Sequence, residues 1–168
     1  MDSIEKLKYI PNASARNLKK ADSKKIGFVL TDIDNSYHAE IFKGASTYLQ
    51  DKGYDINVAF SNNSPDIECK KINDFVSSNV SGLLLITSQP GNTDFFAGRI
   101  KNFNIPTVFI EHRPENIDFS FVGFNNYKTT FFLTENLLRK NYRNIALLTG
   151  PLIYSSERDA VDGYSAAM

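Results

Sequence analysis

Two kinds of hydrophobic pattern alternate along the chain from about residue 25 onward. Short runs of apolar residues are typical of strands buried on both faces, and the longer segments between them carry apolar residues at helical spacing. The pattern predicts strands at residues 26–31, 54–60, 82–87, 106–111, 119–123 and 144–149. It predicts helices at residues 37–52, 65–78, 93–103, 126–140 and 155–168.

The alternation of strands and helices predicts the fold class. Apolar strands separated by amphipathic helices are typical of an α/β protein with a doubly wound parallel sheet covered by helices on both faces. Ligands of such sheets bind beyond the carboxyl ends of the strands. Candidate binding loops are therefore residues 32–38, 61–64, 87–91, 111–114 and 124–127.

The first 25 residues differ from the rest in charge. They hold seven Lys or Arg and three Asp or Glu, a difference of +4, whereas the whole chain has a formal net charge of zero. A basic end on a mildly acidic body indicates an anionic partner for this end. A solubilising tail is the alternative, and charge alone does not decide between the two.

A short helix is predicted within this basic end, at residues 11–18. Asn12 is a good N-cap, but the segment is far below the roughly 12–15 residues needed for marginal helicity in water, so we expect it to fold on contact with a partner. An exposed Leu18 flanked by cations suits the DNA minor groove, and a plain linker is the alternative. The predicted DNA-contacting residues are Asn12, Ala15, Arg16, Leu18 and Lys19.

The pattern Tyr9-x-Pro11-Asn12-x-x-Ala15-Arg16-x-Leu18 resembles the hinge of the lac repressor family of transcription regulators. The later segments Asp32-Ile33-x-Asn35-Ser36-Tyr37, Gly82-Leu83-Leu84-Leu85 and Gly163-Tyr164 are similar to landmarks of that family's two-lobed body. The resemblance covers nearly the whole chain, and the hinge motif is its most specific part.

The resemblance implies a division of the chain and a function. Residues 1–25 would be a remnant of the DNA-binding domain with the hinge helix, residues 26–123 the N-terminal lobe of a periplasmic-binding-protein-like body, and residues 124–168 an incomplete second lobe. The expected function is the effector-sensing part of a transcription regulator, most simply a repressor. Its expected partners are operator DNA, a small carbohydrate effector and a second copy of the chain.

Polar residues in the predicted loops and in the last helix are the candidates for effector binding. Asn35 and Asn125 can donate and accept hydrogen bonds, and the Tyr37 ring can stack on sugar C–H groups. Each also has an ordinary structural role, such as a helix cap or a surface ion pair. The full set of predicted effector-binding residues is Asn35, Tyr37, Thr87, Ser88, Glu111, Arg113, Asn125 and Arg158.

The chain departs from the family pattern at three positions. Ser36 stands where proline is common, and Asn125 replaces a frequent aspartate. Ala160 occupies the position at which many sugar-sensing members carry an arginine. These departures leave the identity of the effector open.

Other classes of protein lack support in the sequence. No phosphate-binding glycine loop follows a predicted strand, and the single cysteine, Cys69, with two histidines gives no metal-ligand spacing, so we expect no enzyme activity, cofactor or metal. No apolar stretch is long enough to span a membrane, and a cytoplasmic location is expected. The alternative function is a sugar-binding protein of a transporter, for which residues 1–25 show neither an export leader nor an anchoring cysteine.

Overall fold

The computed structural model describes residues 23–168. The predicted hinge contacts lie outside the described residues and stay predictions: Asn12, Ala15, Arg16, Leu18 and Lys19. Among the described helices, none combines the length and the apolar character that a membrane crossing requires.

Five parallel strands form one sheet in the order β2-β1-β3-β4-β5. This order, with β1 inside and the chain winding outward in both directions, confirms the predicted doubly wound parallel sheet. The strands are β1 (Lys25–Leu30), β2 (Asp55–Phe60), β3 (Gly82–Leu85), β4 (Thr107–Ile110) and β5 (Ser120–Val122).

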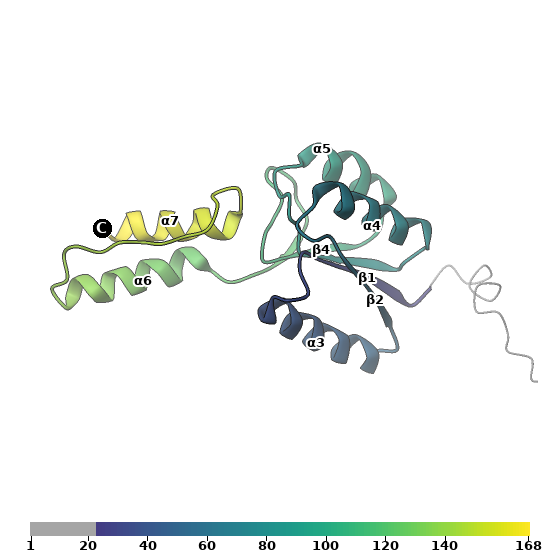
Figure 1. Cartoon of the computed structure of the whole chain (residues 1–168), viewed down its shortest axis with the longest axis horizontal. Helices are drawn as coiled ribbons and strands as arrows, with labels where there is room; N and C mark the ends of the chain where they lie inside the picture. The colour runs from purple at the N-terminus through teal and green to yellow at the C-terminus, as the bar shows by residue number, and fades with distance from the viewer. Residues whose placement is uncertain (1–22) are drawn as a thin grey trace, which may run out of the picture.

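Helices cover both faces of the sheet (Figure 1). On one face lies α3 (Ser36–Asp51), and on the other lie α4 (Pro65–Ser77) and the segment 93–103. The predicted single helix at 93–103 is instead a short α-helical turn, a π-helix and a 3₁₀-helix: α5 (Thr93–Phe95), η1 (Phe96–Ile100) and η2 (Lys101–Phe103).

Alternate residues of β1 supply the two layers of the core, because successive side chains of a strand point to opposite faces. Phe28 and Leu30 pack with Ile86 on the α3 side. Val29 packs with Ile72 on the α4 side, in a larger cluster that is completed by Val80, Leu83, Leu85, Phe96, Ile100 and Phe109. Every one of these core side chains is buried.

Two further helices, α6 (Asn126–Arg139) and α7 (Ser155–Ala167), lie side by side away from the sheet (Figure 1). We call α6, α7 and the segment 140–154 between them the helix pair, and residues 25–122 the sheet region. Gly163 permits the close approach of the two helices, since a methyl group there would lie 2.2 Å from the Tyr127 carbonyl oxygen.

The predicted strand at 144–149 is wrong for the described structure. These residues form no strand, and Leu148 is 98% exposed. A strand needs a neighbour to pair its backbone N–H and C=O groups, and the five described strands all lie in the other region. The segment is instead held by a hydrogen bond of 2.7 Å from the Tyr164 hydroxyl to the Ile145 carbonyl oxygen.

Candidate functional site

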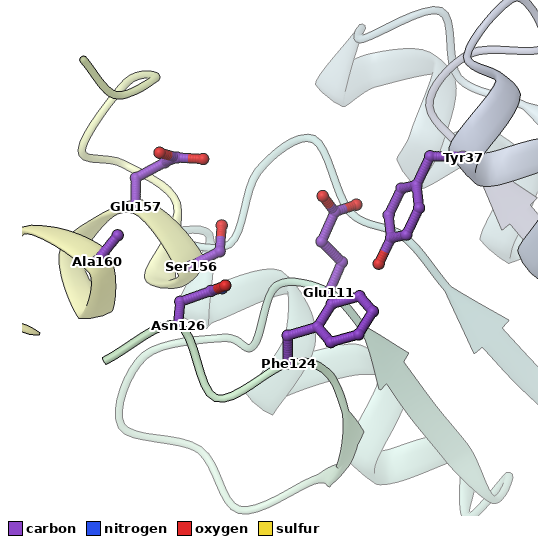
Figure 2. Close-up of a pocket in the computed structure, with 7 residues that line it drawn as sticks. All are labelled: Tyr37, Glu111, Phe124, Asn126, Ser156, Glu157 and Ala160. Carbon is purple, nitrogen blue, oxygen red and sulfur yellow. The ribbon is translucent and has the colours of Figure 1, made fainter. Parts of the chain in front are cut away.

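A cavity of about 200 Å³ lies where the carboxyl ends of β4 and β5 meet the start of α7 (Figure 2). Its walls come from both regions of the molecule, since residues of the sheet region lie on one side and residues of α7 on the other. The lining residues are Tyr37, Glu111, Phe124, Asn126, Ser156, Glu157 and Ala160. The cavity therefore occupies the edge of the sheet at which this fold binds ligands.

Glu111 reaches the cavity through an unusual backbone conformation. It directly follows β4 and has a φ of 69°, in the left-handed region that few non-glycine residues adopt. Its backbone N–H donates a 2.9 Å hydrogen bond to the Val122 carbonyl oxygen of β5, which holds it in this conformation. Strain of this kind is concentrated at functional sites.

A chain of hydrogen bonds fixes the Glu111 carboxylate. His38 Nε2 lies 3.0 Å from Glu111 Oε2, and His38 Nδ1 lies 3.3 Å from the Thr31 hydroxyl. A carboxylate can only accept, so His38 donates from Nε2 and, when neutral, accepts from Thr31 at Nδ1. Burial opposes ionisation of Glu111, but the His38 hydrogen bond and the nearby histidine charges outweigh it and lower the pKa of the carboxyl. Glu111 is thus an anion in the cavity wall.

His112 joins the sheet region to α7. Its Nδ1 lies 3.0 Å from the Ser156 hydroxyl, and its ring stacks on Tyr154 with centroids 4.3 Å apart. Its Nε2 is 3.8 Å from Glu111 Oε2, which is too long for a hydrogen bond. Burial lowers the pKa of His112 despite the pull of the Glu111 and Glu157 carboxylates, so the neutral ring is favoured.

The second carboxylate of the cavity, Glu157, belongs to the first turn of α7. Its Oε2 accepts hydrogen bonds from the Thr149 hydroxyl and, at 3.0 Å, from the Gly150 backbone N–H. Glu157 therefore connects the start of α7 to the end of the preceding extended segment, and its position at a helix N-terminus is favourable for a negative charge.

Both predicted arginines are engaged with other protein groups. The Arg113 guanidinium makes a bidentate pair with Asp159 at 3.0 and 3.1 Å, and it lies over the Phe121 ring. Arg158 pairs with Glu115 at 2.8 Å. Its Nη1 also donates to the Leu152 and Ile153 carbonyl oxygens. Neither arginine lines the cavity.

The predicted asparagines cap helices at the edge of the cavity. Asn35 precedes α3, and its side-chain oxygen accepts a 3.0 Å hydrogen bond from the Tyr37 backbone N–H. Asn125 caps α6 by accepting from the Lys128 N–H at 2.9 Å. These caps place Tyr37 and Asn126 at the first turns of their helices, where both face the cavity.

Thr87 and Ser88 are buried and turn toward α4. Their hydroxyls donate hydrogen bonds of 2.6 and 2.7 Å to the carboxylate of Glu68, which the Ser88 backbone N–H also bonds at 2.7 Å. Glu68 is 1% exposed, so these three donors satisfy a carboxylate that is shielded from water. The cluster ties the end of β3 to the first turn of α4.

The structure brings two of the eight predicted effector residues, Tyr37 and Glu111, into the cavity wall. The other six lie beside it or away from it, in the caps, ion pairs and Glu68 cluster described above. Sequence reasoning did not select the lining residues Phe124, Asn126, Ser156, Glu157 and Ala160. The first two fall in a predicted binding loop. The other three come from α7, for which the rule about strand ends gives no signal. Within residues 23–168, no group of three or more His, Cys, Asp or Glu is arranged to hold a metal ion.

Comparison with known proteins defines the class to which this fold belongs. Residues 26–168 match the model of the periplasmic binding protein domain, and the chain belongs to that family. Among solved structures, the Lac repressor bound to ONPG superposes with a TM-score of 0.81 at 22% identity, over 98% of this chain and 50% of that one. The Cra regulator of Pseudomonas putida, in complex with fructose 1-phosphate, gives 0.77 at 24% identity, over 86% of this chain and 53% of that one.

The sequence relatives of the chain are transcription regulators of the lac repressor family, which confirms the resemblance seen in the sequence. The regulator PtxS of Pseudomonas aeruginosa is 28% identical over 99% of this chain and 48% of its own length. The ribose operon repressor of Escherichia coli is 27% identical over 99% of this chain and 50% of its own length. The chain thus spans about half the length of the curated relatives it matches.

Proposed function

We propose that this chain is the effector-sensing part of a DNA-binding transcription regulator that responds to a small carbohydrate. The observation that carries the proposal is the cavity shared by the sheet region and α7. A ligand held there touches Tyr37 and Glu111 on one side and Ser156 on the other. Its binding free energy therefore depends on how the two regions are arranged, which is the requirement for a ligand to bias a conformational equilibrium.

The regulator is favoured over the alternative, a sugar-binding protein of a transporter. Both share the fold, but the relatives described above are transcription regulators, one of them a ribose operon repressor. We infer that operator DNA is bound through the hinge residues Asn12, Ala15, Arg16, Leu18 and Lys19, in a cytoplasmic homodimer whose two hinges meet a two-fold operator. We expect the regulator to repress transcription, and we assign no catalytic role to the chain.

Two aromatic side chains of the cavity suit a carbohydrate. The Tyr37 and Phe124 rings lie with centroids 6.3 Å apart and planes inclined at 35°. Aromatic faces bind the C–H face of a sugar, and the polar groups of Glu111, Asn126 and Ser156 can bond its hydroxyls. Burial, assisted by the Glu111 carboxylate, raises the pKa of Tyr37, so the phenol keeps its proton and can donate.

Calorimetric titration of the chain with ribose, fructose and glucose tests the proposal. We expect at least one of these free sugars to bind, and we expect Tyr37→Ala to weaken that binding about tenfold, equivalent to ~1.4 kcal/mol. Tyr48→Ala is the matched control, because Tyr48 is the same residue type on the same helix but is 63% exposed and outside the cavity. Equal losses for the two variants, or no binding of any of the three sugars, would contradict the proposal.

A further inference from the structure

The cavity wall contains acidic side chains but, within residues 23–168, no lysine or arginine. Glu111 and Glu157 both contribute carboxylates to it, and among the described residues that line it none is a lysine or an arginine. The two carboxylates come from opposite sides, one after β4 and one from α7 (Figure 2). A ligand in this cavity therefore meets negative charge from both regions.

The two arginines Arg113 and Arg158 already form ion pairs within the protein. Arg113 is held by Asp159, and Arg158 is held by Glu115 and two backbone carbonyls. The charge of each guanidinium group is therefore already paired with a carboxylate of the protein. Ala160, which also lines the cavity, provides no charge of its own.

The two histidines do not reverse this charge. His38 donates a hydrogen bond from Nε2 to the Glu111 carboxylate, and His112 Nδ1 is hydrogen-bonded to the Ser156 hydroxyl. Burial favours the neutral form of His112 by lowering its pKa. A phosphate or carboxylate on the ligand would thus face Glu111 and Glu157 without a lysine or an arginine among the described residues of the cavity wall to pair with it, in a partly desolvated site where like-charge repulsion is strong.

Hydroxyl groups fit the same wall well. Glu157 Oε2 is already bonded to Thr149 and Gly150, and Glu111 Oε2 to His38, so each carboxylate has a second oxygen for a ligand donor. Hydrogen bonds from neutral donors to a carboxylate are stronger than those between neutral groups. A sugar carries several such donors and an apolar C–H face for the Tyr37 and Phe124 rings.

We propose that the cavity selects an uncharged sugar and excludes phosphorylated sugars and sugar acids, with Glu111 and Glu157 as the residues that enforce the exclusion. The inference rests on the proposed function, since it names the chemical class of ligand for the same site. It separates this chain from the Cra regulator, whose solved structure holds fructose 1-phosphate.

Paired titrations test the charge selection. The chain is titrated with ribose, fructose and glucose, with ribose 5-phosphate, fructose 1-phosphate and glucose 6-phosphate, and with gluconate. We expect a free sugar to bind and its charged derivative to bind at least about tenfold more weakly, which corresponds to ~1.4 kcal/mol. Glu111→Gln removes one charge and keeps the side-chain shape, so it should narrow this ratio about tenfold; Glu157→Gln should act in the same direction.

Asp55→Asn is the matched control. It removes the same single charge from an exposed residue at the amino end of β2, at the far end of the strands from the cavity. The ratio of affinities for free and charged sugars should stay at the value of the unsubstituted chain, because a distant exposed charge is screened by salt. A change in the Asp55→Asn ratio equal to that of Glu111→Gln would show a general charge effect and overturn the proposal.

The remaining outcomes separate this inference from the proposed function. If a free sugar binds and a phosphate ester or gluconate binds as tightly or more tightly, the charge selection is wrong, while the effector-sensing function stands. If none of the three free sugars binds, the proposed function itself fails, and the inference fails with it. A ratio that neither glutamine variant changes would remove Glu111 and Glu157 from the proposed role.

Discussion

Apolar side chains have different surroundings in the sheet region and in the helix pair. In the sheet region, Phe28 and Phe109 are fully buried between the strands and the helices that cover them. In the helix pair, Phe132 and Leu133 of α6 are largely exposed, as is Leu148 between the helices. The difference shows that an apolar pattern gives a core only where a second layer of structure covers it.

The two regions also differ in how their elements are joined. The strands of the sheet region are connected by continuous ladders of backbone hydrogen bonds, such as the six paired positions between β1 and β2. The helix pair depends on side-chain packing between α6 and α7, with a close approach at Gly163. We therefore expect substitutions to have effects of different size and extent in the two regions.

The largest effect is expected in the core of the sheet region. Phe109 packs edge-on against Phe96 with centroids 5.1 Å apart and lies 5.1 Å from the Phe119 ring. Phe109→Ala removes these contacts and leaves a cavity, which should lower the free energy of unfolding by about 3–5 kcal/mol. Urea denaturation followed by circular dichroism measures this loss.

Leu148→Ala provides the comparison from the helix pair. Leu148 also lies in an apolar run, but its side chain has almost no contacts to lose. We expect a change within about 0.5 kcal/mol. A destabilisation by Leu148→Ala that approaches that of Phe109→Ala would mean that the 144–149 segment is packed in solution, and the contrast between the two regions would then be wrong.

An intermediate effect is expected at Gly163. The methyl group of Gly163→Ala would meet the backbone of Tyr127, which cannot move aside as a flexible side chain can. Overpacking of this kind costs about 1–3 kcal/mol. Amide hydrogen exchange should therefore increase in α6 and α7 while the strands of the sheet region keep their protection.

A glycine-to-alanine substitution on α3 should stabilise the protein, in contrast to Gly163→Ala. Nothing lies within 4 Å of a methyl group placed at Gly44. Gly44→Ala should therefore stabilise α3 by up to about 1 kcal/mol through helix propensity alone. If Gly163→Ala leaves exchange in α7 unchanged, the close contact between α6 and α7 does not hold the pair together.

The sequence was sufficient to predict most of the sheet region. The apolar runs and helical periodicities located β1 to β5 and the helices between them to within a few residues, because every pattern there found a partner layer. The strand predicted at 144–149 failed because periodicity reports the character of a segment and contains no information on its partners. The π-helix η1 was missed because it has only five residues, about one turn, which is too short for its i→i+5 spacing to be distinguished from the α-helical spacing in the sequence.

The cavity could be located from the sequence, but its lining could be predicted only in part. The rule about strand ends indicated the loops that hold Glu111 and Phe124. It gave no indication that α7 would pack against these loops and contribute Ser156 and Glu157, since that contact is tertiary. The same limit applies to Arg113, whose partner Asp159 lies 46 positions further along the chain.

The contact that joins the two regions, the bond between His112 and Ser156, should make the stability of the protein depend on pH. Burial holds the pKa of His112 below its ordinary value of 6.5, so the unfolded chain binds more protons than the folded chain as the pH falls below about that value. The favourable contribution of the neutral ring is present at higher pH and is lost as the pH falls from about 6.5 through the folded pKa. Glu111, whose pKa is held below 4.5, adds a second loss in the same direction at lower pH.

Melting temperatures measured between about pH 8 and pH 2 should therefore fall toward acid in two steps. His112→Asn should remove the upper step, because asparagine can still bond Ser156 but does not titrate, and it should leave the lower step that belongs to Glu111. Exchange of amides in the first turn of α7 should rise over the same pH range as the upper step, since the protonated ring is unfavourable in its buried position against Ser156 and Tyr154. An upper step that persists in His112→Asn would assign the acid sensitivity to another group and would leave the junction between the two regions independent of pH.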